Sequence, residues 1–539
     1  MSKVATVATP KTLAVKRLIA GASVACAVSL AVVGTFSTAA LATEDGDIAA
    51  EVNGGVTSAL EMATQEDISL LAAADPTPVT TWYDASKTEF TISTLGEMNG
   101  LAQLVNTGVD TFEGKTITLN KTTFPTACEF TSIGTADHPF QGTFQANGSR
   151  LLNPVIVYEG ATDIGLFGYA GEKATIDGIN IVGGTLEVTQ ASGGEKIQYV
   201  GAIAGECLGT VTNCTSSMNV SVSSDVAAKL GTAGTMSEIG GLVGYLGTAM
   251  SGCSFSGTLS ITSAQGVISN TATEEFMRYI AGNIGGLVGR FGSETVEGID
   301  GAQSIEDCTN AGTLSFNITG SSDKDRFGEQ TYSITRCVGG IVGYCSGNVS
   351  GCTNKGLIHT GLGTADAPEK QHGGNCVGGI VGALRGTSLY EAACSLDSQE
   401  VYEPGYYVWK NSEGGTEPRT ISITNCYNEG MVIGLGSVGG ISGSAGCWTE
   451  ILGCGNEGYI KGCRWNKPAP AGIVGNTYGS VGVCYNHGTI ETITRAGYYA
   501  AGIAGFLNTY NNAATPDNLV YDLPEIYSCY STGNVVSDQ

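Results

Sequence analysis

The sequence predicts an all-β protein, a parallel β-solenoid built from about nine copies of one short repeat. A motif of two glycines, two aliphatic residues and a glycine recurs along most of the chain, as in VGGIVG (338–343). A second motif with Cys, Asn and Gly follows it, as in SGCTNKGLIHT (350–360). Gly contributes 80 of 539 residues and charged residues only 14%, a composition that suits many short strands joined by tight turns.

The first 42 residues predict a secretory signal peptide. They contain no acidic residue, and an apolar run at 18–36 precedes the small-residue cleavage site Ala40-Leu41-Ala42. Basic residues come before that run, namely Lys3, Lys11, Lys16 and Arg17. A retained membrane anchor is the alternative. We therefore expect a secreted or cell-surface protein without membrane insertion after cleavage.

Removal of residues 1–42 leaves 21 basic and 50 acidic residues, a net charge of −29. Nucleic acid and anionic membrane surfaces are therefore poor partners, because like charges repel.

Two segments precede the repeats. Residues 43–80 are acidic and rich in Ala, which indicates a flexible linker. Residues 81–160 form an N-terminal helix and strand segment that leads into the solenoid. Apolar residues at helical spacing predict a short helix within 91–108, alternation predicts a strand at 115–120, and 138–157 has the pattern of strand, Asn-Gly turn, strand.

Residues 161–539 contain the repeats. The first motif occurs at 163–168, 200–205, 239–244, 284–289, 338–343, 377–382, 438–443, 470–475 and 500–505. The second occurs at 212–222, 251–261, 306–316, 350–360, 424–434, 452–462, 482–492 and 527–537. The segments that vary in length predict inserts at 263–280, 292–307 and 383–424. Because the motifs themselves stay constant, we expect the inserts at one turn, outside the packed body.

A single copy is too short to bury a core, but stacked copies can do so. The aliphatic residues of each copy are expected to point into a continuous apolar column. Glycines would stand where the chain turns or where neighbouring coils come close, and the Asn amides would bond to equivalents above and below.

Eight cysteines occupy one repeat position: Cys214, Cys253, Cys308, Cys352, Cys426, Cys454, Cys484 and Cys529. In-register neighbours would have parallel Cβ vectors about 4.8 Å apart, wider than the ~3.8 Å of a disulfide. No CxxC spacing or accompanying histidine indicates a metal site. We therefore interpret the ladder as buried packing residues and expect no metal or cofactor. Candidates for a disulfide or two in an exported protein are Cys207, Cys337, Cys345, Cys376, Cys394, Cys447 and Cys463.

The repeat GGIVG…NCYNEGMV resembles the GLUG-type repeat of bacterial surface and secreted proteins. The preceding block, with LAQLVNTGVDTFEGKTITL and PFQGTFQANG, resembles the segment that often leads into such repeats. Together the resemblances cover about residues 82–539. They imply a right-handed β-helix or related solenoid in an exported bacterial protein, commonly linked with adhesion. Several repeats depart from the pattern by lacking the Asn before the Cys.

No catalytic motif stands out. The four histidines, His138, His359, His372 and His487, lack HExxH spacing, and GISGSAG (439–445) lacks the spacing of a nucleophile elbow. A polysaccharide lyase or glycosidase is the enzyme alternative, and it would need carboxylates with an Arg or Lys on adjacent coils. Asp177, Glu206 and Glu429 do not recur in register, so we interpret them as solvated turn residues and expect no enzyme activity and no catalytic residue.

The insert at 383–424 offers the best contact residues, the aromatic side chains Tyr402, Tyr406, Tyr407 and Trp409 around a Pro-Gly turn. The alternative is a loop that covers one solenoid face. The acidic stretch 292–307 lacks the spacing of a Ca²⁺ loop. We expect an adhesin-like scaffold that contacts a host or matrix protein or glycan, or the non-catalytic N-terminal part of a larger surface protein or peptidase. An uncapped last coil would invite continuation or self-association.

Overall fold

The computed structural model describes residues 75–537 except 159–160, 191–196, 225–236, 264–280, 293–302, 319–330, 361–370, 386–419, 447–448, 464–469, 494–499 and 508–523. The predicted signal peptide and most of the predicted linker therefore lie outside the described residues. Within residues 76–539 the chain forms a parallel β-solenoid, and the predicted all-β fold class is confirmed.

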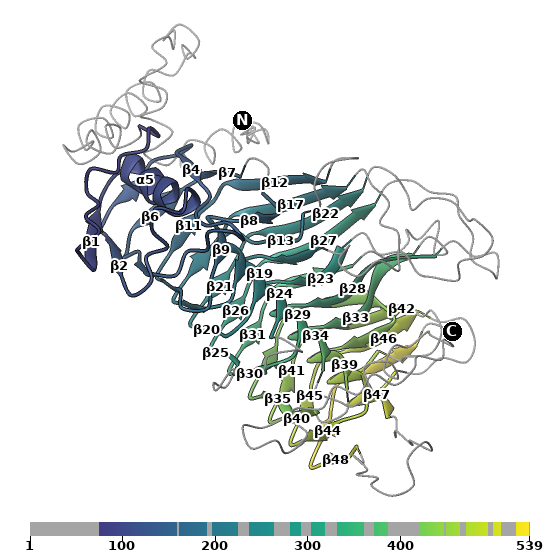
Figure 1. Ribbon diagram of the computed structural model, residues 1–539. Coiled ribbons are helices and arrows are strands. Elements are labelled where there is room, and N and C mark those ends of the chain that lie inside the picture. Colours follow the sequence, from purple (N-terminus) through teal and green to yellow (C-terminus); the bar gives the residue numbers. More distant parts are fainter. Residues whose placement is uncertain are drawn as a thin grey trace, which may run out of the picture. The chain divides into compact units, whose positions relative to one another are not determined.

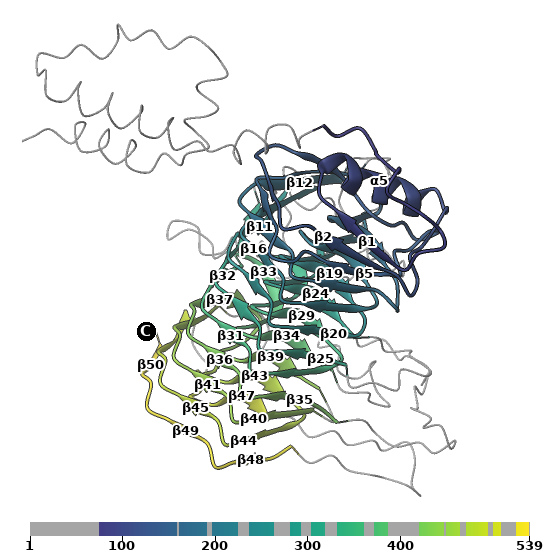
Figure 2. The same ribbon diagram turned by 90° about the vertical axis from the view of Figure 1, so that its left-hand side faces the viewer.

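Each full coil contributes one strand to each of five sheets, which we name E, D, A, B and F in chain order. The strands pair in parallel between successive coils. Figures 1 and 2 show the strands of successive coils stacked in layers, from the helical end in purple to the last coil in yellow.

Sheets E and D carry the first motif. Sheet E consists of β8 (Asp163–Ile164), β13 (Tyr199–Val200), β18 (Glu238–Gly240), β23 (Ala281–Gly285), β28 (Thr331–Gly339), β33 (Gln371–Gly378) and β38 (Ser437–Gly439). Sheet D consists of β9 (Phe167–Ala170), β14 (Ala204–Cys207), β19 (Val243–Leu246), β24 (Val288–Phe291), β29 (Val342–Cys345), β34 (Val381–Leu384), β39 (Ser442–Ala445), β43 (Val474–Thr477) and β47 (Ala504–Leu507).

Sheets A and B meet at the ladder cysteines. Sheet A consists of β1 (Glu89–Ile92), β2 (Thr116–Leu119), β5 (Thr143–Gln145), β10 (Thr175–Asp177), β15 (Thr210–Thr212), β20 (Ala249–Ser251), β25 (Ser304–Glu306), β30 (Asn348–Ser350), β35 (Ile421–Thr424), β40 (Thr449–Leu452), β44 (Ser480–Gly482) and β48 (Ile526–Tyr527). Sheet B consists of β3 (Thr123–Phe124), β6 (Arg150–Leu152), β11 (Asn180–Val182), β16 (Thr215–Ser216), β21 (Ser254–Phe255), β26 (Thr309–Asn310), β31 (Thr353–Asn354), β36 (Tyr427–Asn428), β41 (Gly455–Asn456), β45 (Tyr485–Asn486) and β49 (Tyr530–Ser531).

Sheet F closes each coil and consists of β12 (Thr185–Gln190), β17 (Asn219–Ser224), β22 (Thr258–Ser263), β27 (Thr313–Ile318), β32 (Leu357–His359), β37 (Val432–Leu435), β42 (Ile460–Cys463), β46 (Ile490–Ile493) and β50 (Val535–Ser537). A sixth, two-stranded sheet near the first coil pairs β4 (Glu129–Thr131) with β7 (Val155–Val157).

The inward side chains of one coil explain the core. Val338, Ile341, Val342, Val349 and Ile358 come from sheets E, D, A and F, including the turn between E and D, and each has 0% exposed surface. A fully buried aliphatic side chain of this size contributes about 1.5–3 kcal/mol relative to an exposed one. Repetition of the same inward positions therefore builds one continuous apolar column.

Three corners of the coil stay constant, and one of them needs a left-handed backbone. At the corner between sheets A and B, the residue before the ladder cysteine has a φ near +60°, for example +53° at Asn213 and +62° at Gly252. Asn and Gly tolerate this region better than other residues, which explains why five of the eight coils with a ladder cysteine use one of them here.

The segments of variable length lie at two corners rather than one. Residues 264–280 connect sheet F to sheet E, whereas 293–302 and 386–419 connect sheet D to sheet A. The expectation of a single insertion point is therefore wrong. All three predicted inserts also extend into strands, because 263–280 begins on the last residue of β22, 292–307 contains β25, and 383–424 overlaps the end of β34 and contains β35. Their short apolar alternation was obscured by the polar residues before them.

A helical segment packs at the first coil. The helix α5 (Leu95–Asn106) lies within the predicted range and begins with a capping box between Thr94 and Glu97. Its buried Asn99 donates to the Glu129 carbonyl at 3.0 Å and accepts from the Thr131 amide at 2.9 Å, which joins the helix to β4. These two bonds fix the helix against the start of the stack.

Candidate functional site

Two positions beside the first motif come together in space. In the copies of the first motif that contribute a strand to sheet E, the residue immediately before the first aliphatic residue lies on that sheet, and we name this position x. The residue immediately after the last glycine lies on sheet D, and we name this position y. A Cβ at Gly205 would lie 2.4 Å from the Ile164 amide nitrogen, and one at Gly244 would lie 2.5 Å from that of Val200. Glycine therefore lets the sheet D backbone contact sheet E of the preceding coil, which places x and y side chains side by side.

The first three coils that contain strands of both sheets E and D fill these positions with alternating carboxylates and tyrosines. Along x, Asp163 pairs with Tyr199 and Tyr199 with Glu238. Along y, Tyr169 pairs with Glu206 and Glu206 with Tyr245. The two columns alternate out of phase, so that each carboxylate has tyrosines as neighbours. We call these six residues the tyrosine–carboxylate strip.

Asp163 is the acidic residue in the first coil of the strip, and it is buried. Its side chain is 8% exposed, and Oδ2 accepts from the Thr162 hydroxyl at 3.3 Å. Oδ1 is buried and has no hydrogen-bond partner. Burial raises the pKa of Asp163 to about 6, and the Thr162 hydrogen bond opposes this rise.

Glu206 is half-buried on the next coil. Burial, followed by the nearby Asp163 charge, raises the pKa of Glu206 to about 7, whereas a hydrogen bond with Tyr169 opposes the rise. Burial and the Glu206 charge also raise the pKa values of Tyr169 and Tyr199. Both carboxyl groups therefore titrate near neutral pH, while both tyrosines stay protonated there.

Glu238, in the third coil of the strip, is buried and its carboxylate accepts hydrogen bonds from Asn283. It is 6% exposed, and it accepts from the Asn283 amide at 2.8 Å and from Asn283 Nδ2 at 3.2 Å. Tyr199 and Tyr245 stack beside it with ring centroids 5.4 Å apart and an interplanar angle of 28°. This part of the strip has its polar partners within the chain.

A cation from the chain lies at the far end of the strip. The Arg290 guanidinium carbon is 6.0 Å from the ring centroid of Tyr245 and 5.4 Å from that of Tyr344. These distances suit cation–π attraction, which is about 0.5–2 kcal/mol. From the next coil onwards x and y lose this character, and Cys337, Tyr344, Cys376 and Ala383 form a buried cluster.

The strip can bind hydroxyl groups or cations through its carboxylates and tyrosines, and it can exchange protons near pH 6–7. The interpretation of Glu206 as a solvated turn residue is wrong, because it lies half-buried in β14. Asp177 ends β10 and accepts from Thr212 and Asn213 at 2.8 Å, whereas Glu429 is exposed and lies 3.8 Å from Lys355. The signal that would have found the strip is the pair of residues that flank each repeated glycine motif.

The eight ladder cysteines lie in one column, each at the corner between sheets A and B. All but Cys529 are buried. The Cys253 amide donates to Cys308 Sγ at 3.4 Å, and Cys253 Sγ donates to the Ser251 carbonyl at 3.3 Å. Similar bonds recur at other coils. The thiols thus fill the corner and satisfy backbone groups there.

The cysteines outside the ladder form no disulfide among the described residues. Cys207, Cys337, Cys345 and Cys376 are buried and outside any disulfide, and burial raises the pKa values of Cys207 and Cys345 to about 12. Cys394, Cys447 and the side chain of Cys463 lie outside the described part of the chain, where the expectation of a bridge stays a prediction.

The predicted contact aromatics Tyr402, Tyr406, Tyr407 and Trp409 also lie outside the described residues, as do residues 293–302 of the acidic insert.

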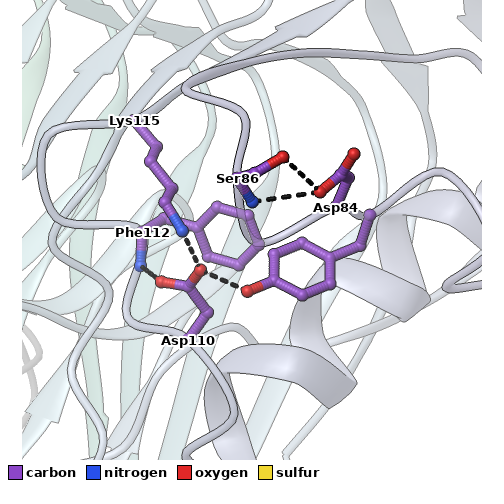
Figure 3. A network of polar contacts seen from close by, with 6 residues as sticks. Asp84, Ser86, Asp110, Phe112 and Lys115 are labelled. Atoms are coloured by element: carbon purple, nitrogen blue, oxygen red, sulfur yellow. Dashed lines mark hydrogen bonds and ion pairs between the residues drawn. The ribbon is translucent and has the colours of Figure 1, made fainter.

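Figure 3 shows a second polar network, near the start of the solenoid. Asp110 accepts from the Tyr83 hydroxyl at 2.6 Å, from the Phe112 amide at 2.7 Å and from Lys115 Nζ. Lys115 also lies over the rings of Tyr83 and Phe112. Because this carboxylate is paired within the chain, we interpret the network as part of the structural start of the stack.

Across the described residues, no group of three His, Cys, Asp or Glu side chains has the arrangement of a metal site. No helix among the residues that the structure describes has the length and apolar character needed to cross a bilayer. Comparison of the chain with models of protein families, with curated proteins and with solved structures gives no match.

Proposed function

We propose that this protein is an exported bacterial surface scaffold that binds a host or matrix component without catalysing a reaction. The observation that carries the proposal is the contrast between the repeated interior and the strip. Inward positions use the same residue types in coil after coil, whereas x and y combine acids with tyrosines only within the strip and hold other residue types farther along the stack. A rigid body with a local set of distinctive side chains, several of them partly exposed, suits recognition.

Three features of the sequence support export and contact. The first 42 residues have the pattern of a signal peptide. The repeats resemble the GLUG type, which implies a secreted or surface protein with an adhesive role. The net charge of −29 after cleavage favours encounters with basic partners.

The experiment that tests the proposal has two parts. Cell fractionation of the producing organism should place the protein at the surface or in the medium. The full-length protein should also bind at least one component of an array of extracellular matrix proteins and glycans. A cytoplasmic protein, or an array without any signal, would contradict the proposed function.

A second candidate is a carbohydrate-active enzyme on a parallel β-helix, and one observation favours it. Asp163, Glu206 and Glu238 lie on three adjacent coils with Arg290 on the fourth, which is the type of arrangement that such an enzyme needs. The pKa of about 7 for Glu206 would suit a general acid. Release of reducing ends or unsaturated sugars from a polysaccharide panel, lost in Glu206→Gln, would establish this candidate in place of the scaffold.

A further inference from the structure

Resting on the proposed binding function, we infer that the strip recognises a basic segment of a partner protein, whose lysine or arginine side chains enter beside Tyr169 and Tyr199 to reach Glu206 and Asp163.

The chain itself provides the precedent for this geometry. Arg290 sends a long side chain from β24 over the Tyr245 ring, and its charge also favours ionisation of Tyr199. Tyr245 follows Glu206 in the same column and stacks on Tyr199. The third and fourth coils therefore show that a cation on a flexible stem fits against the tyrosines of this strip.

In the first two coils of the strip, the carboxylates of Asp163 and Glu206 also lie among tyrosines. Their negative charge, however, is not offset by a positive charge from the described residues. The Asp163 charge contributes to the raised pKa of Glu206, after burial, which is the larger cause. None of the lysines or arginines that the structure describes counteracts this effect at either group. The buried Oδ1 of Asp163 also lacks a donor. An incoming cation would offset the charge of the two carboxylates.

Burial decides which kind of cation fits. Asp163 is only 8% exposed, and Glu206 is half-buried between tyrosines of the neighbouring coils. Lysine and arginine carry their charge on long flexible stems whose methylene groups pack against aromatic rings. The amine of an amino sugar is attached directly to a bulky ring and has no such reach. A basic polypeptide is therefore favoured over a cationic glycan, and the acidic surface would attract it at long range.

The test uses the full-length protein and a fluorescein-labelled peptide of alternating lysine and serine, followed by fluorescence anisotropy. The matched control peptide carries acetyl-lysine, which keeps most of the stem and removes the charge. We expect saturable binding of the lysine peptide and at least tenfold weaker binding of the acetylated one, because a charge-assisted hydrogen bond is lost.

Three variants locate the binding. Glu206→Gln and Asp163→Asn keep the side-chain volume, and each should weaken binding of the lysine peptide at least about tenfold. Glu429→Gln removes one equally negative but exposed carboxylate, 3.8 Å from Lys355, and should change affinity less than about twofold. Far-UV circular dichroism of each variant checks that the solenoid is intact.

Equal weakening by Glu429→Gln and Glu206→Gln would overturn the inference, because binding would then follow net charge alone. Tighter binding of a chitosan oligomer than of the lysine peptide, lost in Glu206→Gln, would overturn it in favour of an amino sugar. Array binding that survives in both strip variants would also overturn it, while leaving the proposed scaffold function in place.

Discussion

The side-chain amide of Asn354 donates to Oδ1 of Asn428 at 2.8 Å, although 74 residues separate the two along the chain. The same bond joins Asn310 to Asn354, Asn428 to Asn456 and Asn456 to Asn486. All five amides are buried. The chain between Asn354 and Asn428 therefore returns to the same register, and the bonds between asparagine side chains anticipated from the repeat are present.

Replacing Asn428 with Leu should destabilise the solenoid by about 2–4 kcal/mol, because it leaves buried amide groups of Asn354 and Asn456 without their partners. The measurement is urea unfolding of the full-length protein by circular dichroism. The adjacent Glu429→Gln is the control, since that side chain is exposed. An unfolding midpoint equal to that of the control would show that the amide bonds contribute nothing.

Val483 should yield a stabilising substitution. It has a φ of +53° at the corner where other coils use Asn, Gly, Asp or Ser, and its side chain is 55% exposed. A β-branched residue in this left-handed region costs roughly 1–2 kcal/mol. Val483→Asn should therefore raise the free energy of unfolding by about 1 kcal/mol.

The matched control for this gain is Val109→Asn, since Val109 is 60% exposed and has no positive φ. It should leave stability unchanged or slightly lower. Thermal unfolding of both variants decides the matter, and a gain of equal size at Val109 would mean that polarity rather than backbone strain is responsible.

Gly340 should not tolerate a side chain. A Cβ there would lie 2.0 Å from the Gly379 carbonyl oxygen and 2.6 Å from Asn354 Cγ. At Gly446 the nearest atom, Arg385 Cδ, would be 3.5 Å away. Gly340→Ala should thus lower stability by more than about 2 kcal/mol, whereas Gly446→Ala should change it by less than about 0.5 kcal/mol. Equal urea midpoints for the two variants would contradict close coil packing at Gly340.

The repetition explains which features could be predicted. Inward aliphatics, glycines, cysteines and asparagines recur because every coil meets the same neighbours, so that one copy predicts the next. The strip does not recur. Asp163, Glu206 and Glu238 alternate between x and y, and only the close approach of sheets E and D at Gly205 and Gly244 brings them together. That approach depends on three-dimensional packing, which the spacing of the acids along the chain does not reveal.

Stability should fall as pH rises from about 4 to 8 through a contribution of the strip. The folded protein holds protons on Asp163 up to a pKa of about 6 and on Glu206 up to about 7, above the ordinary values of 3.8 and 4.5. In this window the folded state binds more protons than the unfolded state, so that deprotonation favours unfolding.

The check on this pH dependence compares urea unfolding of the wild-type protein and Glu206→Gln at pH 4, 6 and 8. Because groups outside the strip titrate equally in both proteins, the difference between the two curves isolates Glu206 and the strip groups coupled to it. We expect the variant to gain stability relative to the wild type as pH rises. Parallel curves would show that the pKa of Glu206 is not raised.

Cys207 and Cys345 should resist alkylation in the native protein. Both are 0% exposed, and burial raises their pKa values to about 12, so that little thiolate is present at pH 8. Iodoacetamide labelling followed by peptide mass spectrometry should modify them only after unfolding in guanidinium. The partly exposed Cys529 of the last coil is the internal reference. Labelling of Cys207 as fast as Cys529 would contradict its burial.

Confinement of length variation to two corners makes each coil an interchangeable layer. Unequal exchange between equivalent corners of two gene copies would delete or duplicate whole layers, and the amide and thiol columns would rejoin across the junction without new contacts. A lineage could thus shift the strip along the axis or present it twice within one polypeptide. Changes in reach and in valency would then evolve without redesign of the interior.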